Sequence, residues 1–160
     1  VINEVGKGFK VAMEVLNNGR LGLASGCIGV SKTLLRLALE RVNERRAFGR
    51  NIGEFGLIKD KIARMLAETY ALESMTYLTA GIIDSKVSDY SLESAMCKVK
   101  GSEMCWSIVN DTLQIAAGIG YMQEYPYERI LRDSRINLIF EGTNEILRCF
   151  IALSGMSSPG

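Results

Sequence analysis

The chain has 160 residues, with 48% hydrophobic and 23% charged side chains and a formal net charge of +1. The near-neutral charge gives no electrostatic reason for binding nucleic acid or an anionic membrane surface, and the length is typical of one domain with its own core. Histidine is absent, which removes the commonest general base and the commonest metal ligand. Acid–base chemistry therefore falls to Asp, Glu, Lys, Tyr or Cys side chains.

The hydrophobic periodicity is helical nearly everywhere. It predicts helices over residues 9–16, 20–45, 55–85, 91–117, 127–136 and 144–153. The first is expected to stop at the Asn17-Asn18-Gly19 segment, a typical helix C-terminus, and Ser91 is expected to be an N-cap. No pair of strands joined by a hairpin turn is expected. Three long helices with short connections predict an all-α fold, an up-down four-helix-type bundle with additional short helices.

The four cysteines, Cys27, Cys97, Cys105 and Cys149, have no CxxC spacing and lie among apolar or small neighbours. We expect buried free thiols of a reducing compartment and no metal site. No apolar run is long enough to span a bilayer. The sequence starts without an initiator Met, and we interpret it as an excised domain, so that missing targeting signals carry no information about location.

The segment "ERRAFGRNIGEFG" lies between two long predicted helices and contains Arg45, Arg46 and Arg50 around Phe48 and Gly49. Arginines beside an aromatic ring and a flexible glycine suit a phosphate group and a flat ring. The alternative is a solvated loop whose cations favour the dipole of a helix C-terminus. Composition alone favours the solvated loop.

A second segment, "LQIAAGIGYM", contains Gln114, Gly118 and Gly120. Gln114 can donate and accept hydrogen bonds, and the glycines allow a backbone to approach a neighbour closely. The pattern is not a GxGxxG motif after a strand, so it does not indicate a Rossmann fold. By itself it is best interpreted as the C-terminal cap of a helix.

The third segment, "RINLIFEGTNEILR", is an apolar run that ends in Glu141 and Gly142. Thr143 or Asn144 can cap the helix that follows, and the free N–H groups at a helix start bind anions or carbonyl oxygens. Glu141 is either a structural acid or a base beside an oxyanion-type stabiliser. Considered alone, the pattern favours the structural acid.

Four segments together resemble the C-terminal domain of the acyl-CoA dehydrogenase family in their order and spacing. They are "GKGFKVAMEVLNNGR", "ERRAFG", "QIAAGIGY…EYPYERILRDSRI" and "IFEGTNEILR". The resemblance covers essentially the whole chain and is strongest to the very-long-chain branch, including its family-nine group. It implies that residues 1–160 are the C-terminal helical domain of a larger flavoenzyme. The amino-terminal helical domain and the β-domain are absent from the chain, so the isolated fragment is expected to be inactive.

The resemblance implies that Glu141 is the base that removes the α-proton of an acyl-CoA thioester. In some members of the family the base lies at the position matching Gly19, which leaves Glu141 without a rival here. Asn17 and Arg20 match positions that line the acyl-CoA site, and Gly142 is assigned to the substrate as well.

The resemblance also implies a bound FAD and a homodimer as the smallest functional unit. Arg45 would contact the FAD pyrophosphate of the neighbouring subunit, with Phe48 beside it, and Gln114 and Gly118 would lie along the adenosine end. Thr143 and Asn144 match positions that touch the subunit's own FAD.

Two departures from the family pattern concern the cofactor. Many relatives have Thr or Gln where this chain has Ala47, so a hydrogen bond to FAD is expected to be lost. The family commonly has glycine where this chain has Ala117, and the added methyl group is expected to crowd a close backbone approach.

The resemblance implies oxidation of a long-chain acyl-CoA to the trans-2-enoyl-CoA, with electrons passing to electron transfer flavoprotein. It further implies a mitochondrial location, in the matrix or at the inner membrane. An alternative is an assembly or scaffold role in the biogenesis of respiratory complex I, because family-nine relatives have that second role. A helical interaction bundle without a site is a third hypothesis, which the ordered match of all the segments disfavours.

Overall fold

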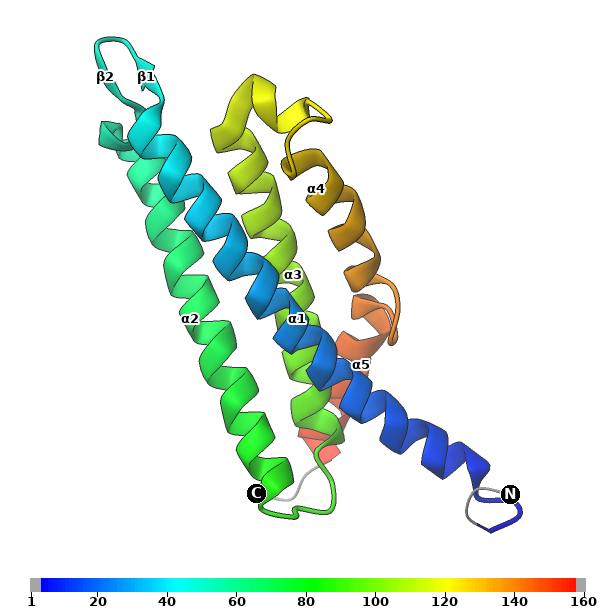
Figure 1. The fold of residues 1–160 in the computed structure, drawn as a ribbon. Helices are drawn as coiled ribbons and strands as arrows, with labels where there is room; N and C mark the ends of the chain where they lie inside the picture. Colours follow the sequence, from blue (N-terminus) through cyan, green and yellow to red (C-terminus); the bar gives the residue numbers. More distant parts are fainter. Residues whose placement is uncertain (1–3, 158–160) are drawn as a thin grey trace.

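Figure 1 shows three long helices that run up and down side by side, with shorter helices packed against them. The structure is a computed structural model and describes residues 4–157. The long helices are α1 (Gly8–Glu44), α2 (Gly56–Asp84) and α3 (Ser91–Ala116), and α4 (Tyr127–Arg135) and α5 (Asn144–Ser157) pack against α3. Three short 3₁₀ segments, η1 (Ile52–Glu54), η2 (Ala117–Tyr121) and η3 (Ile136–Leu138), join them. The predicted all-α bundle is confirmed.

The main core lies where α1, α2 and α3 meet. Leu34 of α1, Met65 and Leu72 of α2, and Ile108 and Val109 of α3 are all at most 1% exposed. A smaller cluster, formed by Ala95, Val99 and Leu147, fixes α5 on α3. Removing this apolar surface from water is the main stabilising term for the bundle.

The predicted stop at Asn17-Asn18-Gly19 is wrong, because α1 continues through this segment without a break. A helix stop of that kind needs a glycine with positive φ, and Gly19 does not have one. The side chains here interact within the continuous helix, where the Asn17 Oδ1 atom accepts a hydrogen bond from Arg20 Nη1 at 3.0 Å. Gly19 lies against the loop that precedes α5.

A short β-hairpin connects α1 to α2, although the sequence predicts no strand pair. Strand β1 (Arg46–Ala47) pairs antiparallel with β2 (Arg50–Asn51). The two turn residues, Phe48 and Gly49, both have positive φ, of 52° and 83°, which is the backbone geometry that two-residue hairpin turns require. Phenylalanine is an unusual residue at such a position, and this is why the turn is not recognisable from the sequence.

Three smaller expectations are also corrected. Ser91 is the first residue of α3 rather than its N-cap. Instead, Asp89 Oδ1 accepts a hydrogen bond from the Ser91 backbone N–H at 2.9 Å, and hydrogen bonds from Ser91 lower the pKa of the Asp89 carboxyl. Cys149 is exposed, whereas Cys27, Cys97 and Cys105 are buried free thiols as expected. The last helix extends to Ser157, four residues beyond the expected end.

Helix α1 is long and apolar enough to cross a membrane, by length and composition only. The expectation that no such run exists is therefore wrong. However, α1 packs against both α2 and α3, and the core helix of a bundle passes the same test. The side chain of Arg20, in the middle of its N-terminal half, is buried by the protein itself. We interpret α1 as a core helix.

Truncation of Leu34 tests the position of the core. Because this side chain is 1% exposed between the long helices, Leu34→Ala is expected to lower the free energy of unfolding by about 2–5 kcal/mol. The matched control is Leu78→Ala on α2, where the leucine is 69% exposed; its effect should stay within about 0.5 kcal/mol. Urea unfolding followed by circular dichroism measures both, and equal losses would contradict this assignment of the core.

Candidate active site

The loop between η3 and α5, residues 139–143, carries Glu141 in a strained backbone conformation. Glu141 has a φ of 60° and Gly142 a φ of 95°. A left-handed conformation costs nothing special at glycine, but it costs roughly 1–3 kcal/mol at a residue with a side chain. Surrounding contacts must therefore hold Glu141 in place.

Two buried cations hold successive carbonyl groups of this loop. Arg20 of α1 donates from Nε to the Glu141 carbonyl oxygen at 3.2 Å. Lys98 of α3 donates from Nζ to the Gly142 carbonyl oxygen at 2.7 Å. The Arg20 residue is 7% exposed and Lys98 is fully buried. Hydrogen bonds from charged donors are roughly twice as strong as neutral ones, so these two contacts offset the backbone strain.

Burial sets the electrostatics of both cations. Burial lowers the pKa of the Lys98 ammonium group, and the positive charge of Arg20 lowers it further, whereas Cys27, Glu141 and Glu145 act in the opposite direction. Burial also lowers the pKa of Arg20, and Glu141 partly offsets this. Each cation is thus desolvated, with Glu141 as a nearby source of negative charge for both.

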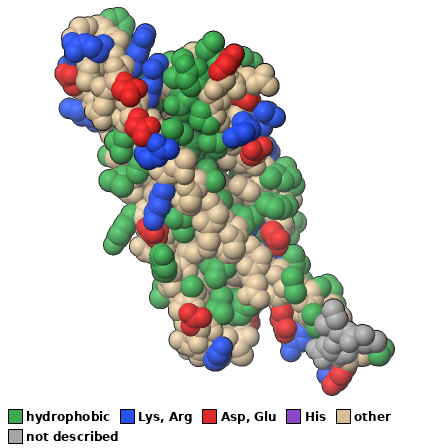
Figure 2. Space-filling model, in the orientation of Figure 1, with side chains coloured by type: hydrophobic (Ala, Val, Ile, Leu, Met, Phe, Trp, Pro, Cys, Tyr) green, Lys and Arg blue, Asp and Glu red, His purple; other side chains and the backbone are tan. Residues whose placement is uncertain are grey.

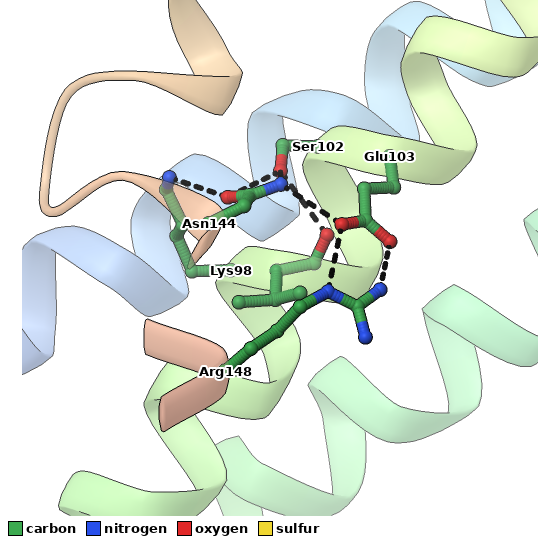
Figure 3. A network of polar contacts seen from close by, with 6 residues as sticks. Lys98, Ser102, Glu103, Asn144 and Arg148 are labelled. Carbon is green, nitrogen blue, oxygen red and sulfur yellow. Dashed lines mark hydrogen bonds and ion pairs between the residues drawn. The ribbon is translucent and has the colours of Figure 1, made fainter. Parts of the chain in front are cut away.

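A polar network links the loop to the outside of the bundle (Figure 3). Lys98 Nζ also donates to Asn144 Oδ1 at 2.8 Å, and Asn144 Nδ2 donates to Ser102 Oγ at 2.9 Å and to Glu103 Oε1 at 3.3 Å. Glu103 in turn forms an ion pair with Arg148 of α5. The network ties the start of α5 to α3 on the inner side of the loop.

The Glu141 carboxylate lies directly against Gly19 of α1. A Cβ atom built on Gly19 would lie 3.0 Å from both carboxylate oxygens, so a glycine at this position gives the carboxylate its space. The Glu141 Oε2 atom is buried and has no hydrogen-bond partner. Leaving a buried carboxylate oxygen unpaired costs free energy, and such a group is a candidate for a function rather than for stability.

The two cations also determine where backbone N–H groups of the loop point. In a trans peptide the C=O and N–H bonds point in opposite directions, and all described peptide bonds are trans. With the carbonyls of Glu141 and Gly142 directed at Arg20 and Lys98, the N–H groups of Gly142 and Thr143 are directed away from them. Within residues 4–157 neither N–H group donates to a protein acceptor. Two free donors thus lie next to an unpaired carboxylate.

The structure brings together the predicted residues around Glu141. Arg20 donates hydrogen bonds to the Asn17 side chain and to the Glu141 carbonyl oxygen. The carbonyl oxygen of Gly142 accepts a hydrogen bond from Lys98. Thr143 is half-buried, whereas Asn144 is 4% exposed and uses its side chain in the inner network. Any contact of Asn144 with a ligand therefore comes from its backbone.

The other predicted residues lie at the far end of the bundle, where α1 and α3 end and α2 begins (Figure 1). Arg45 is exposed, and Phe48 is 94% exposed at the tip of the hairpin. Arg50 is exposed as well, and its guanidinium group stacks on the Phe55 ring, 4.1 Å from the ring centroid. On the face in Figure 2, Lys and Arg side chains gather at this hairpin end.

Gln114, in the last turn of α3, and Gly118, in η2, are both exposed. The two glycines of this segment differ in what they do. A Cβ atom on Gly120 would lie 2.6 Å from the Leu113 carbonyl oxygen, whereas a Cβ atom on Gly118 would meet nothing within 4 Å. Gly120 is therefore required by the packing of this chain, and Gly118 faces open space.

Sequence reasoning missed Lys98, Ser102 and the contact between Gly19 and Glu141. A signal for Lys98 was present in the helical period, since Ser94, Ala95, Ser102 and Cys105, at spacings of three, four and seven residues, are all buried. A lysine on the buried face of a helix needs a partner. The contact of Gly19 with Glu141 joins residues 122 positions apart and has no local signal.

Fold and site together describe a helical-bundle domain in which Glu141 is the one carboxylate of residues 4–157 with a buried, unpaired oxygen atom. The family model "Acyl-CoA dehydrogenase, C-terminal domain" matches residues 6–156. The chain therefore belongs to the acyl-CoA dehydrogenase family, as the predicted resemblance indicated.

Relatives of known name agree with this assignment. The chain is 45% identical over its whole length to the very long-chain specific acyl-CoA dehydrogenase, mitochondrial, of Homo sapiens, and spans 24% of that protein. Among solved structures, an acyl-CoA dehydrogenase complexed with FAD from Bacillus anthracis superimposes with a TM-score of 0.90 and 38% identity, over 96% of this chain and 29% of that one. Butyryl-CoA dehydrogenase from Megasphaera elsdenii gives a TM-score of 0.91 at 32% identity, over 96% and 40%.

The two glycines of the α3 end give a matched pair of variants. Gly120→Ala is expected to lower the free energy of unfolding by about 1–3 kcal/mol, because the methyl group meets a backbone carbonyl. Gly118→Ala should change it by less than about 0.5 kcal/mol, because its methyl group meets open space. Chemical denaturation measures both, and similar losses for the two variants would be evidence against the distinction.

Replacing either of two adjacent alanines, Ala116 and Ala117, by glycine should change the stability in opposite directions. Ala117 has a φ of 56° and a ψ of −134°, whereas Ala116 has helical angles of −65° and −24°. Ala117→Gly should raise the free energy of unfolding by about 1 kcal/mol because it relieves strain, and Ala116→Gly should lower it by at least about 0.5–1 kcal/mol. The midpoints of thermal unfolding report both effects. A destabilised Ala117→Gly protein would refute the assignment of strain.

Proposed function

We propose that this chain carries the catalytic base of a flavin-dependent acyl-CoA dehydrogenase, and that Glu141 is this base. The observation that carries the proposal is the unpaired, buried Oε2 atom of Glu141 beside the free N–H groups of Gly142 and Thr143. A base and donors for a developing negative charge, held within one turn, suit proton abstraction next to a carbonyl group.

In this proposal Glu141 takes the α-proton of an acyl-CoA thioester. Negative charge then develops on the thioester oxygen, and the backbone N–H groups of Gly142 and Thr143 stabilise it without reorganising, because Arg20 and Lys98 fix the loop. When bound, FAD supplies the acceptor for the β-hydrogen, which leaves as hydride, so the products are the trans-2-enoyl-CoA and the reduced cofactor. Asn17 and Arg20 line the acyl-CoA side of the carboxylate.

The residues present fit a flavin cofactor in two places. At the hairpin end we assign Arg45, Phe48, Gln114 and Gly118 to the FAD of a neighbouring subunit, because these groups are exposed and Gly118 faces open space. At the loop we assign Thr143 and the backbone of Asn144 to the subunit's own FAD. The FAD reported for the Bacillus anthracis relative supports this assignment.

Two distant sets of cofactor residues on one chain favour a homodimer, in which each FAD contacts both subunits. The very-long-chain relatives support a long-chain acyl-CoA as substrate and a mitochondrial location, in the matrix or at the inner membrane. Electron transfer flavoprotein is the proposed acceptor of the electrons. The alternative role in complex I assembly rests on the family-nine resemblance alone, and no contact described above favours it.

The test uses the full-length subunit that contains this chain, purified with FAD and mixed anaerobically with palmitoyl-CoA. The flavin absorbance of the parent should bleach, and Glu141→Gln should slow this bleaching by about 10²- to 10⁴-fold, because the amide cannot accept the proton. Glu145→Gln is the matched control, because Glu145 is an exposed glutamate four residues further along, in the first turn of α5. This variant should bleach like the parent.

Two outcomes would contradict the proposal. Equal bleaching of the parent and of Glu141→Gln would remove Glu141 from the role of base. A parent that retains FAD but does not bleach with palmitoyl-CoA would remove the dehydrogenase activity, and the assembly role would then be the hypothesis to test.

A further inference from the structure

Lys98 is fully buried in α3 and yet points its ammonium group at the loop rather than at a carboxylate. Its ammonium group donates to two neutral acceptors, the Gly142 carbonyl oxygen at 2.7 Å and Asn144 Oδ1 at 2.8 Å. Burying an ammonium group without a paired anion is costly. An apolar side chain at this position would pack at lower cost, so stability of the bundle does not by itself account for a lysine.

The two acceptors flank the N-terminus of α5. Gly142 follows Glu141 directly, and Asn144 is the first residue of the helix. One ammonium group therefore fixes both the residue after Glu141 and the start of the element that follows. Arg20, which lies on α1 near the start of the chain, fixes the carbonyl group of Glu141 itself.

The geometry points to a role for Lys98 that rests on the proposed function. We propose that Lys98 is a positioning residue for the reaction, which holds the Glu141 carboxylate and the Thr143 N–H group in their working orientations through its contacts with Gly142 and Asn144. Its partner in this role is Arg20, which orients the adjacent peptide group. Lys98 does not contact the substrate in this proposal.

The network beyond Asn144 supports Lys98 from the outside. Ser102 and Glu103 accept hydrogen bonds from Asn144 Nδ2, which leaves Asn144 Oδ1 directed at Lys98 (Figure 3). The Asn144 amide is thus held in the orientation that presents an oxygen atom to the ammonium group. A supporting shell of this kind limits the movement of the groups that do the chemistry.

The first measurement is hydrogen–deuterium exchange of the FAD-loaded full-length subunit, without substrate. Lys98→Met, which keeps the length and removes the charge, should speed exchange of the amides in residues 139–147 by about tenfold or more, while α1 and α2 exchange as in the parent. Lys98→Gln, which retains a shorter neutral donor, should restore part of the protection. Lys100→Met is the matched control, because Lys100 is exposed two residues further along α3, and it should leave exchange unchanged.

The second measurement is anaerobic flavin reduction by palmitoyl-CoA. Lys98→Met should lower the limiting rate at saturating substrate by about 10- to 100-fold, because a displacement of about 1 Å is enough for such a loss. The half-saturating concentration should change much less, since Lys98 makes no contact with the substrate. Lys98→Gln should lie between Lys98→Met and the parent in rate.

The proposal would be overturned by unchanged exchange in residues 139–147, or by faster exchange spread evenly over all helices, which marks a purely structural role. If Lys98→Met does not fold, the comparison of Lys98→Gln with the parent decides by the same two criteria. A parent that fails to reduce its flavin refutes the proposed function, whereas the exchange data still decide whether Lys98 orders the loop.

Discussion

The site depends on one arrangement of charge: two cations from different helices bind two successive carbonyl groups of one loop. Arg20 and Lys98 are both buried, and their charges repel each other. The carbonyl group of Glu141 accepts a hydrogen bond from Arg20, and that of Gly142 accepts one from Lys98. These two hydrogen bonds replace part of the hydration that the cations lose on burial. The strained backbone at Glu141 and the two buried charges are each unfavourable alone, and each becomes tolerable through the other.

Glycine contributes to the site by what it leaves out. At Gly19 the absence of a Cβ atom leaves room for the Glu141 carboxylate, and at Gly142 it permits a φ of 95°. Neither residue provides a chemical group, but both determine where a carboxylate can lie. Ala117 is the opposite case, because its methyl group is kept in a backbone conformation that favours glycine.

The helices could be predicted because their apolar periodicity is long and regular, and the bounds of α2, α3 and α4 agree within one residue with those expected. The stop at Gly19 was wrong because the local rule was overridden by a contact with Glu141, which lies far away in sequence. Phe48 in a left-handed turn could not be predicted from residue type. The role of Glu141 was predicted from the family resemblance, since its apolar surroundings alone favoured a structural acid. Lys98 was missed because a lysine on a long helix is normally solvated.

The position of the two cations also makes the site depend on parts of the chain that are far apart in sequence. Arg20 comes from the first long helix, Lys98 from the third, and the loop from near the end of the chain. A chain in which this loop is not packed against α1 and α3 lacks both contacts. The buried, unpaired position of the Glu141 carboxylate therefore requires all three parts of the chain to be packed together, and a molecule in which one of them is displaced contains the residue without its supporting contacts.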